Sequence, residues 1–171
     1  FKDFNCHVEY YKPEFLIVQG RTPPKAPHRV KFTLRMYQMV WTSHHWRNID
    51  VLVLNVGHWW NYHKTIKMNC YFQIGNEVNM NMSTEDTFRI SVETIVDWIA
   101  REVNRNRTHV FFRTYALVHF RGGDWNTGGG CLSETLPDLG SLPTQSDLHF
   151  SIVANVLPQH TNIRSVYFGL A

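Results

Sequence analysis

The sequence has little cysteine and no long apolar segment, and each scarcity excludes a class of protein. Only three cysteines occur among 171 residues, Cys6, Cys70 and Cys131, and none stands in a zinc-type spacing such as Cys-x-x-Cys. The odd count leaves at least one unpaired within the chain, unless its partner lies outside it. No stretch is long and apolar enough to be a membrane-spanning helix, and no secretory signal peptide is visible.

Motifs for phosphate, nucleic acid and metal are absent as well. The 17 lysines and arginines are scattered, and the net charge is only +3, so we expect no nucleic-acid partner. The triple glycine at 128–130 lacks the Lys-Ser/Thr pair of a phosphate-binding loop. His58 and His63 are five residues apart, a spacing that does not suit one helix face. We therefore predict no metal site and no cofactor.

The chain also lacks the sequence motifs of a serine nucleophile. Neither Gly-x-Ser-x-Gly nor Gly-Asp-Ser occurs anywhere in the chain. Ser43 precedes His44 and His45, but adjacency in sequence does not establish the geometry of a nucleophile and its base. We predict that no serine of this chain is catalytic.

Aromatic residues, in contrast, are abundant at 14% of the chain, with six tryptophans. Five of these lie near predicted loops or the ends of predicted elements: Trp41, Trp46, Trp59, Trp60 and Trp125. One interpretation is core packing, and the other is sugar binding, in which apolar sugar faces stack on the rings while nearby polar groups bond the hydroxyls. Composition alone leaves both open.

Hydrophobic periodicity predicts a single α/β domain, for which a hydrophobic content of 43% provides the core. Strands are expected over residues 7–18, 30–36, 51–56, 70–73 and 109–115, with another starting at 163. Helices are expected over 84–103 and 145–160 and, less clearly, 37–47, with loops over 19–29 and 121–144. The run at 51–56, all β-branched or Leu except Asn55, suits a parallel strand buried on both faces. The order of elements predicts a parallel α/β sandwich.

Two segments, 52–60 and 110–125, each read as a buried strand that breaks into a polar, aromatic loop. Ligand sites of α/β proteins form at such strand ends. The predicted cleft residues are Asn55, Gly57, His58, Trp59, Trp60, Arg113, His119, Asp124 and Trp125. The Asn55 amide and the Gly57 N–H could donate hydrogen bonds to an anion or oxyanion. The alternative is that His119 and Asp124 only hold the loop and that the tryptophans are core.

Longer strings within these segments resemble one protein family. They are Gly57-His58-Trp59-Trp60, Cys70-Tyr71-Phe72-Gln73, Phe112-Arg113-Thr114-Tyr115, and His119-Phe120-Arg121-Gly122-Gly123-Asp124-Trp125 continuing to Gly129-Gly130-Cys131. From about Phe4 to about Asn162 the chain resembles the plant trichome birefringence-like proteins, the PC-esterase family of polysaccharide O-acetyltransferases. Residues 1–171 would then be one partial C-terminal domain of this family.

The resemblance implies a fold similar to the SGNH or GDSL esterases, a three-layer sandwich with a mostly parallel central sheet, here incomplete at both ends. It implies acetyl transfer, through a catalytic serine, from an acetyl donor to hydroxyls of a plant cell-wall polysaccharide. It also implies location in the Golgi lumen, as part of a type II membrane protein whose N-terminal anchor is missing from this chain. Cys6 and Cys131 would pair with cysteines outside the chain.

The family's Gly-Asp-Ser and Asp-x-x-His blocks, which carry its catalytic triad, are both absent here, and Leu117 replaces a proline usual in the family. The chain begins with Phe1 rather than Met, so we expect a piece of a longer protein that is inactive alone. The alternatives are a non-catalytic carbohydrate-binding module and an unstable truncated fragment. Two Asn-x-Ser/Thr sequons, at Asn81 and Asn106, are predicted glycosylation sites compatible with the secretory pathway.

Overall fold

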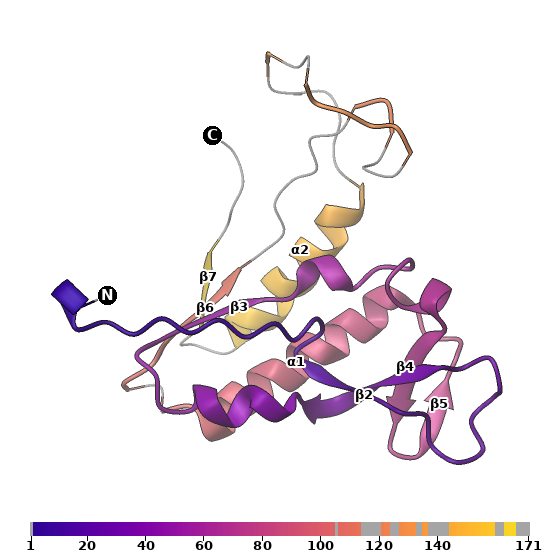
Figure 1. Cartoon of the computed structure of the whole chain (residues 1–171), viewed down its shortest axis with the longest axis horizontal. Coiled ribbons are helices and arrows are strands. Elements are labelled where there is room, and N and C mark those ends of the chain that lie inside the picture. The colour runs from indigo at the N-terminus through magenta and orange to yellow at the C-terminus, as the bar shows by residue number, and fades with distance from the viewer. Residues whose placement is uncertain are drawn as a thin grey trace.

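The computed structural model describes residues 2–104, 106–113, 121–123, 127–132, 135–136, 144–159 and 163–166, which form two sheets and two main helices (Figure 1). The first sheet contains β1 (Ile17–Gly20), β2 (Phe32–Met39), β4 (Cys70–Ile74) and β5 (Glu77–Asn79) in the order β1-β2-β4-β5. Only the β2–β4 pair is parallel in this sheet. The second sheet contains β3 (Val51–Asn55), β6 (His109–Arg113) and β7 (Ile163–Val166), all parallel, with β6 in the centre.

Helix α1 (Thr84–Glu102) begins and packs as its sequence predicts. The Ser83 hydroxyl accepts the Asp86 N–H at 3.0 Å, so the first turn is capped. One stripe of the helix is apolar and buried, formed by Phe88, Val92, Ile95, Val96 and Ile99. The buried Ser91, Thr94 and Trp98 widen the buried face to roughly 200° of the helix circumference at 100° per residue. The Thr94 hydroxyl donates to the Met36 carbonyl oxygen of β2 at 2.8 Å, which fixes the helix on the first sheet.

One hydrophobic core joins both sheets and both helices. Buried side chains from β2, β3, β4, β6 and α1 meet those of α2 (Thr144–Val156) in a single cluster. The strand residues that contribute include Leu34, Leu54, Phe72 and Phe112. The carboxyl ends of β3 and β6 are therefore held against α1 and α2 by a continuous apolar core.

β3 differs from the prediction of a strand buried on both faces. Its residues alternate, with Leu52 and Leu54 buried while Val51 and Val53 are 54% and 59% exposed. β3 is an edge strand of the described sheet, and only the face toward the core is covered. The β-branched composition correctly predicted a strand, but it could not predict whether a second layer covers it.

The prediction of a three-layer sandwich with a mostly parallel sheet is confirmed only in part. Among the described strands, the second sheet is wholly parallel, whereas the first has two antiparallel pairings. The exposed Val51 and Val53 leave the outer face at β3 without a covering layer in the described residues. The fold is α/β with mixed sheets.

Most other predicted elements are confirmed, with two corrections near the N-terminus. The strand at 70–73, the strand from 163 and both main helices are present, within a few residues of the expected bounds. The strand expected over 109–115 is present at 109–113, and residues 114 and 115 lie outside the described part of the chain. The strand expected over 7–18 is wrong for most of its length, because only β1 enters a sheet and Val8 and Tyr10 are exposed. The possible helix at 37–47 is instead the end of β2 followed by a 3-10 helix at Trp41–Trp46.

Candidate functional site at the carboxyl ends of β3 and β6

The two predicted strand ends lie side by side in the second sheet. β3 and β6 are parallel and adjacent, and their register pairs Asn55 with Arg113. Gly57 follows β3 and is buried. A small pocket opens at this edge, with a volume near that of a single water molecule. Its lining residues come from both strand ends and both helices: Gly57, Phe88, Phe112, Arg113, His149, Phe150 and Val153.

Two histidines at this edge, His58 and His149, have lowered pKa values. Partial burial lowers the pKa of His58, and the nearby Arg113 cation lowers it further. Burial also lowers the pKa of His149, which the Glu85 carboxylate opposes and His58 reinforces. The neutral form of both imidazoles is therefore favoured near pH 7. A neutral imidazole can accept a proton as a general base.

His149 is a residue of this edge that sequence analysis missed. Its side chain is 2% exposed, and its ring centroid lies 4.5 Å from that of Phe88. The available signal was its position, since His149 precedes Ile152 and Val153 by three and four residues and so falls on the buried stripe of α2. A titratable side chain on an apolar stripe invites a functional hypothesis, but only the tertiary structure brings this one to the pocket.

The two adjacent tryptophans after β3 have different environments. Trp60 is fully buried, with its ring centroid 5.2 Å from Phe15 and 5.9 Å from Phe88. Its predicted place in a sugar-binding cleft is therefore corrected to the core. Trp59 is partly buried, and the Lys64 ammonium lies 4.9 Å from its ring centroid. Of the two, Trp59 keeps ring surface available to a ligand.

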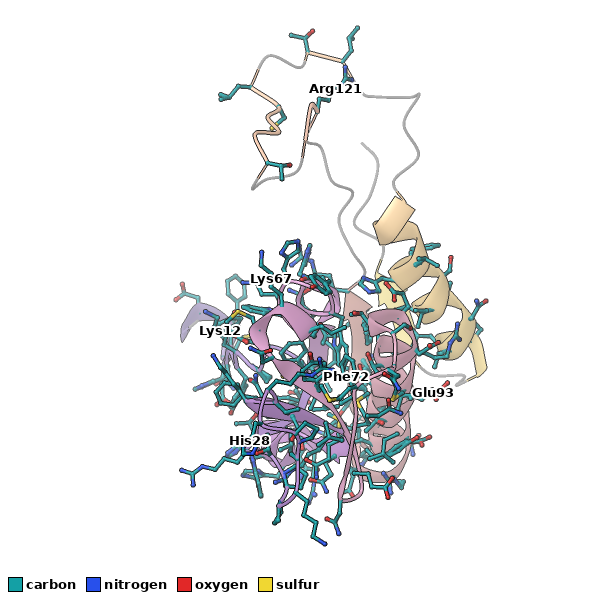
Figure 2. The ribbon with its side chains drawn as sticks, turned by 90° about the vertical axis from the view of Figure 1, so that its right-hand side faces the viewer. Lys12, His28, Lys67, Phe72, Glu93 and Arg121 are labelled. Carbon is teal, nitrogen blue, oxygen red and sulfur yellow. The ribbon has the colours of Figure 1, made fainter. Side chains whose placement is uncertain are left out.

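The remaining predicted cleft residues divide between the described edge and other parts of the chain. Asn55 is exposed at the end of β3, beside Arg113. His119, Asp124 and Trp125 lie outside the described residues. Between them, Arg121 exchanges two backbone hydrogen bonds with Gly130, of 3.1 and 3.2 Å, and lies well away from the two sheets (Figure 2).

The predicted disulfide cysteines and glycosylation sites are exposed. Cys6 and Cys131 are exposed, and no disulfide joins cysteines within the described residues. The sequon residues Asn81 and Asn106 are both exposed. In the described part of the chain, no group of three or more His, Cys, Asp or Glu side chains could hold a metal ion. Among the same residues, no helix has the length and apolarity to cross a membrane.

Comparison with known proteins identifies the family. PC-esterase, described as the GDSL/SGNH-like acyl-esterase family found in Pmr5 and Cas1p, matches residues 1–166. The chain belongs to the PC-esterase family. The α/β fold and the convergence of two strand ends on one pocket agree with a GDSL/SGNH-like domain. Membership places the chain in a family described as GDSL/SGNH-like acyl-esterases.

Curated relatives carry the trichome birefringence names, as the resemblance predicted. Trichome birefringence-like 9 of Arabidopsis thaliana is 36% identical over 165 residues, which cover 94% of this chain and 40% of that protein. Trichome birefringence-like 6 of the same plant is 34% identical, with coverages of 93% and 33%. The protein trichome birefringence itself is 39% identical, with coverages of 80% and 22%. The chain thus spans 40% or less of each of these relatives.

Proposed function

We propose that this PC-esterase chain forms part of a domain that transfers acetyl groups to hydroxyls of a plant cell-wall polysaccharide. The observation that carries the proposal is the family match over residues 1–166, within which the strand-end residues Gly57, His58 and Arg113 meet at one edge. The partners are an acetyl donor and a polysaccharide acceptor. The proposed location is the Golgi lumen, within a type II membrane protein.

The edge supplies parts of an acyl-transfer site. Backbone N–H groups around the buried Gly57 and the Arg113 cation could stabilise negative charge that develops on an acyl oxygen. A neutral His58 could accept the proton of a sugar hydroxyl as a general base. Since the 171 residues contain no Gly-Asp-Ser, we propose that they form no serine acyl-enzyme by themselves.

A second candidate is carbohydrate binding without catalysis. It is favoured by the partly buried Trp59, which follows the pocket residue Gly57 by two positions and whose ring centroid lies 4.9 Å from the Lys64 ammonium. Sugars stack on such rings whether or not a reaction follows. The two candidates differ in one measurable respect: the first requires acetyl transfer when the rest of the domain is supplied, and the second does not.

A chimera tests the proposal. In the chimera, the matched part of this chain replaces the corresponding 165-residue segment of trichome birefringence-like 9. Acetyl transfer from a labelled donor to wall polysaccharides is then measured for the chimera and for unaltered trichome birefringence-like 9. Transfer by both proteins supports the proposed function. A chimera that is folded and binds glycan, but is inactive while the relative is active, contradicts it and favours the binding module. Circular dichroism and a cooperative melt establish that the chimera is folded.

A further inference from the structure

The two Asn-x-Ser/Thr sequons of the chain lie at opposite ends of α1. The first, at 81–83, immediately precedes the helix, and the second, at 106–108, follows it. Asn81 and Asn106 are both exposed. An N-glycosylation acceptor is recognised by the hydroxyl of its third residue as well as by its asparagine. The environments of Ser83 and Thr108 therefore decide whether each sequon can be used once the chain has folded.

The hydroxyl of Ser83 is held by the first turn of its own helix. It accepts the Asp86 N–H at 3.0 Å and donates to Asp86 Oδ2 at 2.8 Å. Ser83 and the preceding Met82 are both partly exposed. Because these bonds join residues only three positions apart and helix ends fray, the hydroxyl can be released while the core stays packed.

The hydroxyl of Thr108 is held by a residue far away in the sequence. Thr108 is 4% exposed, and its hydroxyl donates to the Ile49 carbonyl oxygen at 2.6 Å. On either side of it, Arg107 Nε donates to Asp50 Oδ1 at 3.2 Å and the His109 N–H donates to the Asp50 carbonyl oxygen at 2.8 Å. Releasing this hydroxyl therefore requires the start of β6 to separate from the segment that leads into β3.

We propose that both sequons are N-glycosylation sites and that folding closes only the second. Asn106 accepts its glycan before β6 joins β3, whereas Asn81 still accepts one in the folded chain. In each case C1 of the first sugar of a lipid-pyrophosphate oligosaccharide forms a bond to the asparagine side-chain nitrogen. The bond from C1 to the pyrophosphate oxygen breaks, that oxygen keeps the electron pair, and the amide nitrogen loses one proton to solvent. The modification rests on the proposed location in the secretory pathway, and the difference between the two sites rests on the fold.

A glycan on Asn106 would lie at the opposite end of the strands from the pocket. β3 and β6 are parallel, and their register pairs Val51 with His109 at the amino ends and Asn55 with Arg113 at the carboxyl ends. The strand length between these two pairs is about 13 Å at about 3.3 Å per residue. Asn106 precedes the amino end of β6, whereas the pocket lies at the carboxyl ends. The glycan would therefore leave the pocket open.

The test compares the folded chain with its own sequons in short peptides. The 171-residue chain is made without glycans in bacteria and is then incubated with a purified oligosaccharyltransferase and a lipid-linked oligosaccharide. Peptides of residues 77–89 and 102–112 give the rate of each sequon without tertiary structure. N106Q and N81Q isolate the two sites, and S83T gives both sequons the same third residue while keeping a capping hydroxyl. A cooperative melt of the chain and of the sequon variants verifies that they are folded.

The quantity compared is the glycosylation rate in the folded chain divided by the rate in the matching peptide. At Asn81 we expect a reduction of no more than about tenfold, because only a helix cap has to open. At Asn106 we expect a reduction of about a hundredfold or more, because tertiary contacts have to open. W60A, which truncates a fully buried ring, should raise the Asn106 ratio and leave the Asn81 ratio nearly unchanged.

Three outcomes would overturn the proposal. Equal ratios at the two sites would mean that the fold does not distinguish the sequons. An Asn106 ratio that W60A leaves unchanged would remove the role of tertiary packing. A peptide that the enzyme fails to modify would show that its asparagine is not a glycosylation site. Since no step of the test involves acetyl transfer, each of these outcomes would leave the proposed function intact.

Discussion

Alanine substitutions of Trp60 and of Trp59 distinguish a structural role from a ligand-binding role at two adjacent positions. Trp60 is fully buried between Phe15 and Phe88, so W60A removes an indole from a packed core. Such truncations cost about 3–5 kcal/mol, which for a chain of this size lowers the melting temperature by about 6–20 °C. Trp59 is only partly buried, and W59A should cost about 1 kcal/mol or less.

The assay is urea and thermal unfolding of the purified chain, followed by circular dichroism at 222 nm, with glycan binding measured on the same samples. A W60F variant guards against complete unfolding of W60A. W60F keeps a ring in the core and removes an indole N–H that has no acceptor among the described residues. It should therefore lower the free energy of unfolding less than W60A does. Equal destabilisation by W59A and W60A would refute the assignment of these two rings.

Three further predictions concern the helices and the buried thiol. S83A should destabilise the chain by about 1 kcal/mol, because the N-terminus of α1 loses its cap, and urea unfolding measures this. Burial lowers the pKa of His149, so the unfolded chain binds more protons; stability should fall as the pH drops below about 6.5, and H149Q should flatten that dependence in melts from pH 7.5 to 5. If both proteins lose stability in parallel, His149 is not the cause. Cys70 is 1% exposed and burial raises the pKa of its thiol to about 11, so a thiol reagent should label it far more slowly than the exposed Cys131, until denaturant abolishes the difference.

The elements predicted best are those whose signals are local. The stripe of α1 and its Ser83 cap depend on residues within one or two turns, and the helix forms where they predict it. The Leu and β-branched run of β3 likewise predicted a strand. The prediction of a strand over 7–18 was wrong for most of its length, because an alternating pattern does not by itself provide a neighbouring strand to pair with. In this region only β1 pairs, and its partner is β2.

The candidate site was predicted where two strands end, and its composition was predicted less well. Asn55, Gly57 and Arg113 follow from the rule that parallel strands place their carboxyl ends at one edge. Trp60 was wrongly assigned to the cleft. A tryptophan after a strand is compatible with core packing and with ligand binding, and the sequence does not indicate which of the two adjacent rings faces inward. His149 was missed because its helix lies about 90 residues from β3 along the chain.

The sequence by itself determined the family, the α/β class and the main helices. These depend on residue identity and short-range periodicity, which the chain states directly. Only the tertiary structure decided that Trp60 is fully buried and Trp59 only partly, that Val51 and Val53 face outward, and that His149 approaches His58 and Arg113. Burial and electrostatic coupling arise between segments distant in sequence, so they exist only once the chain has packed.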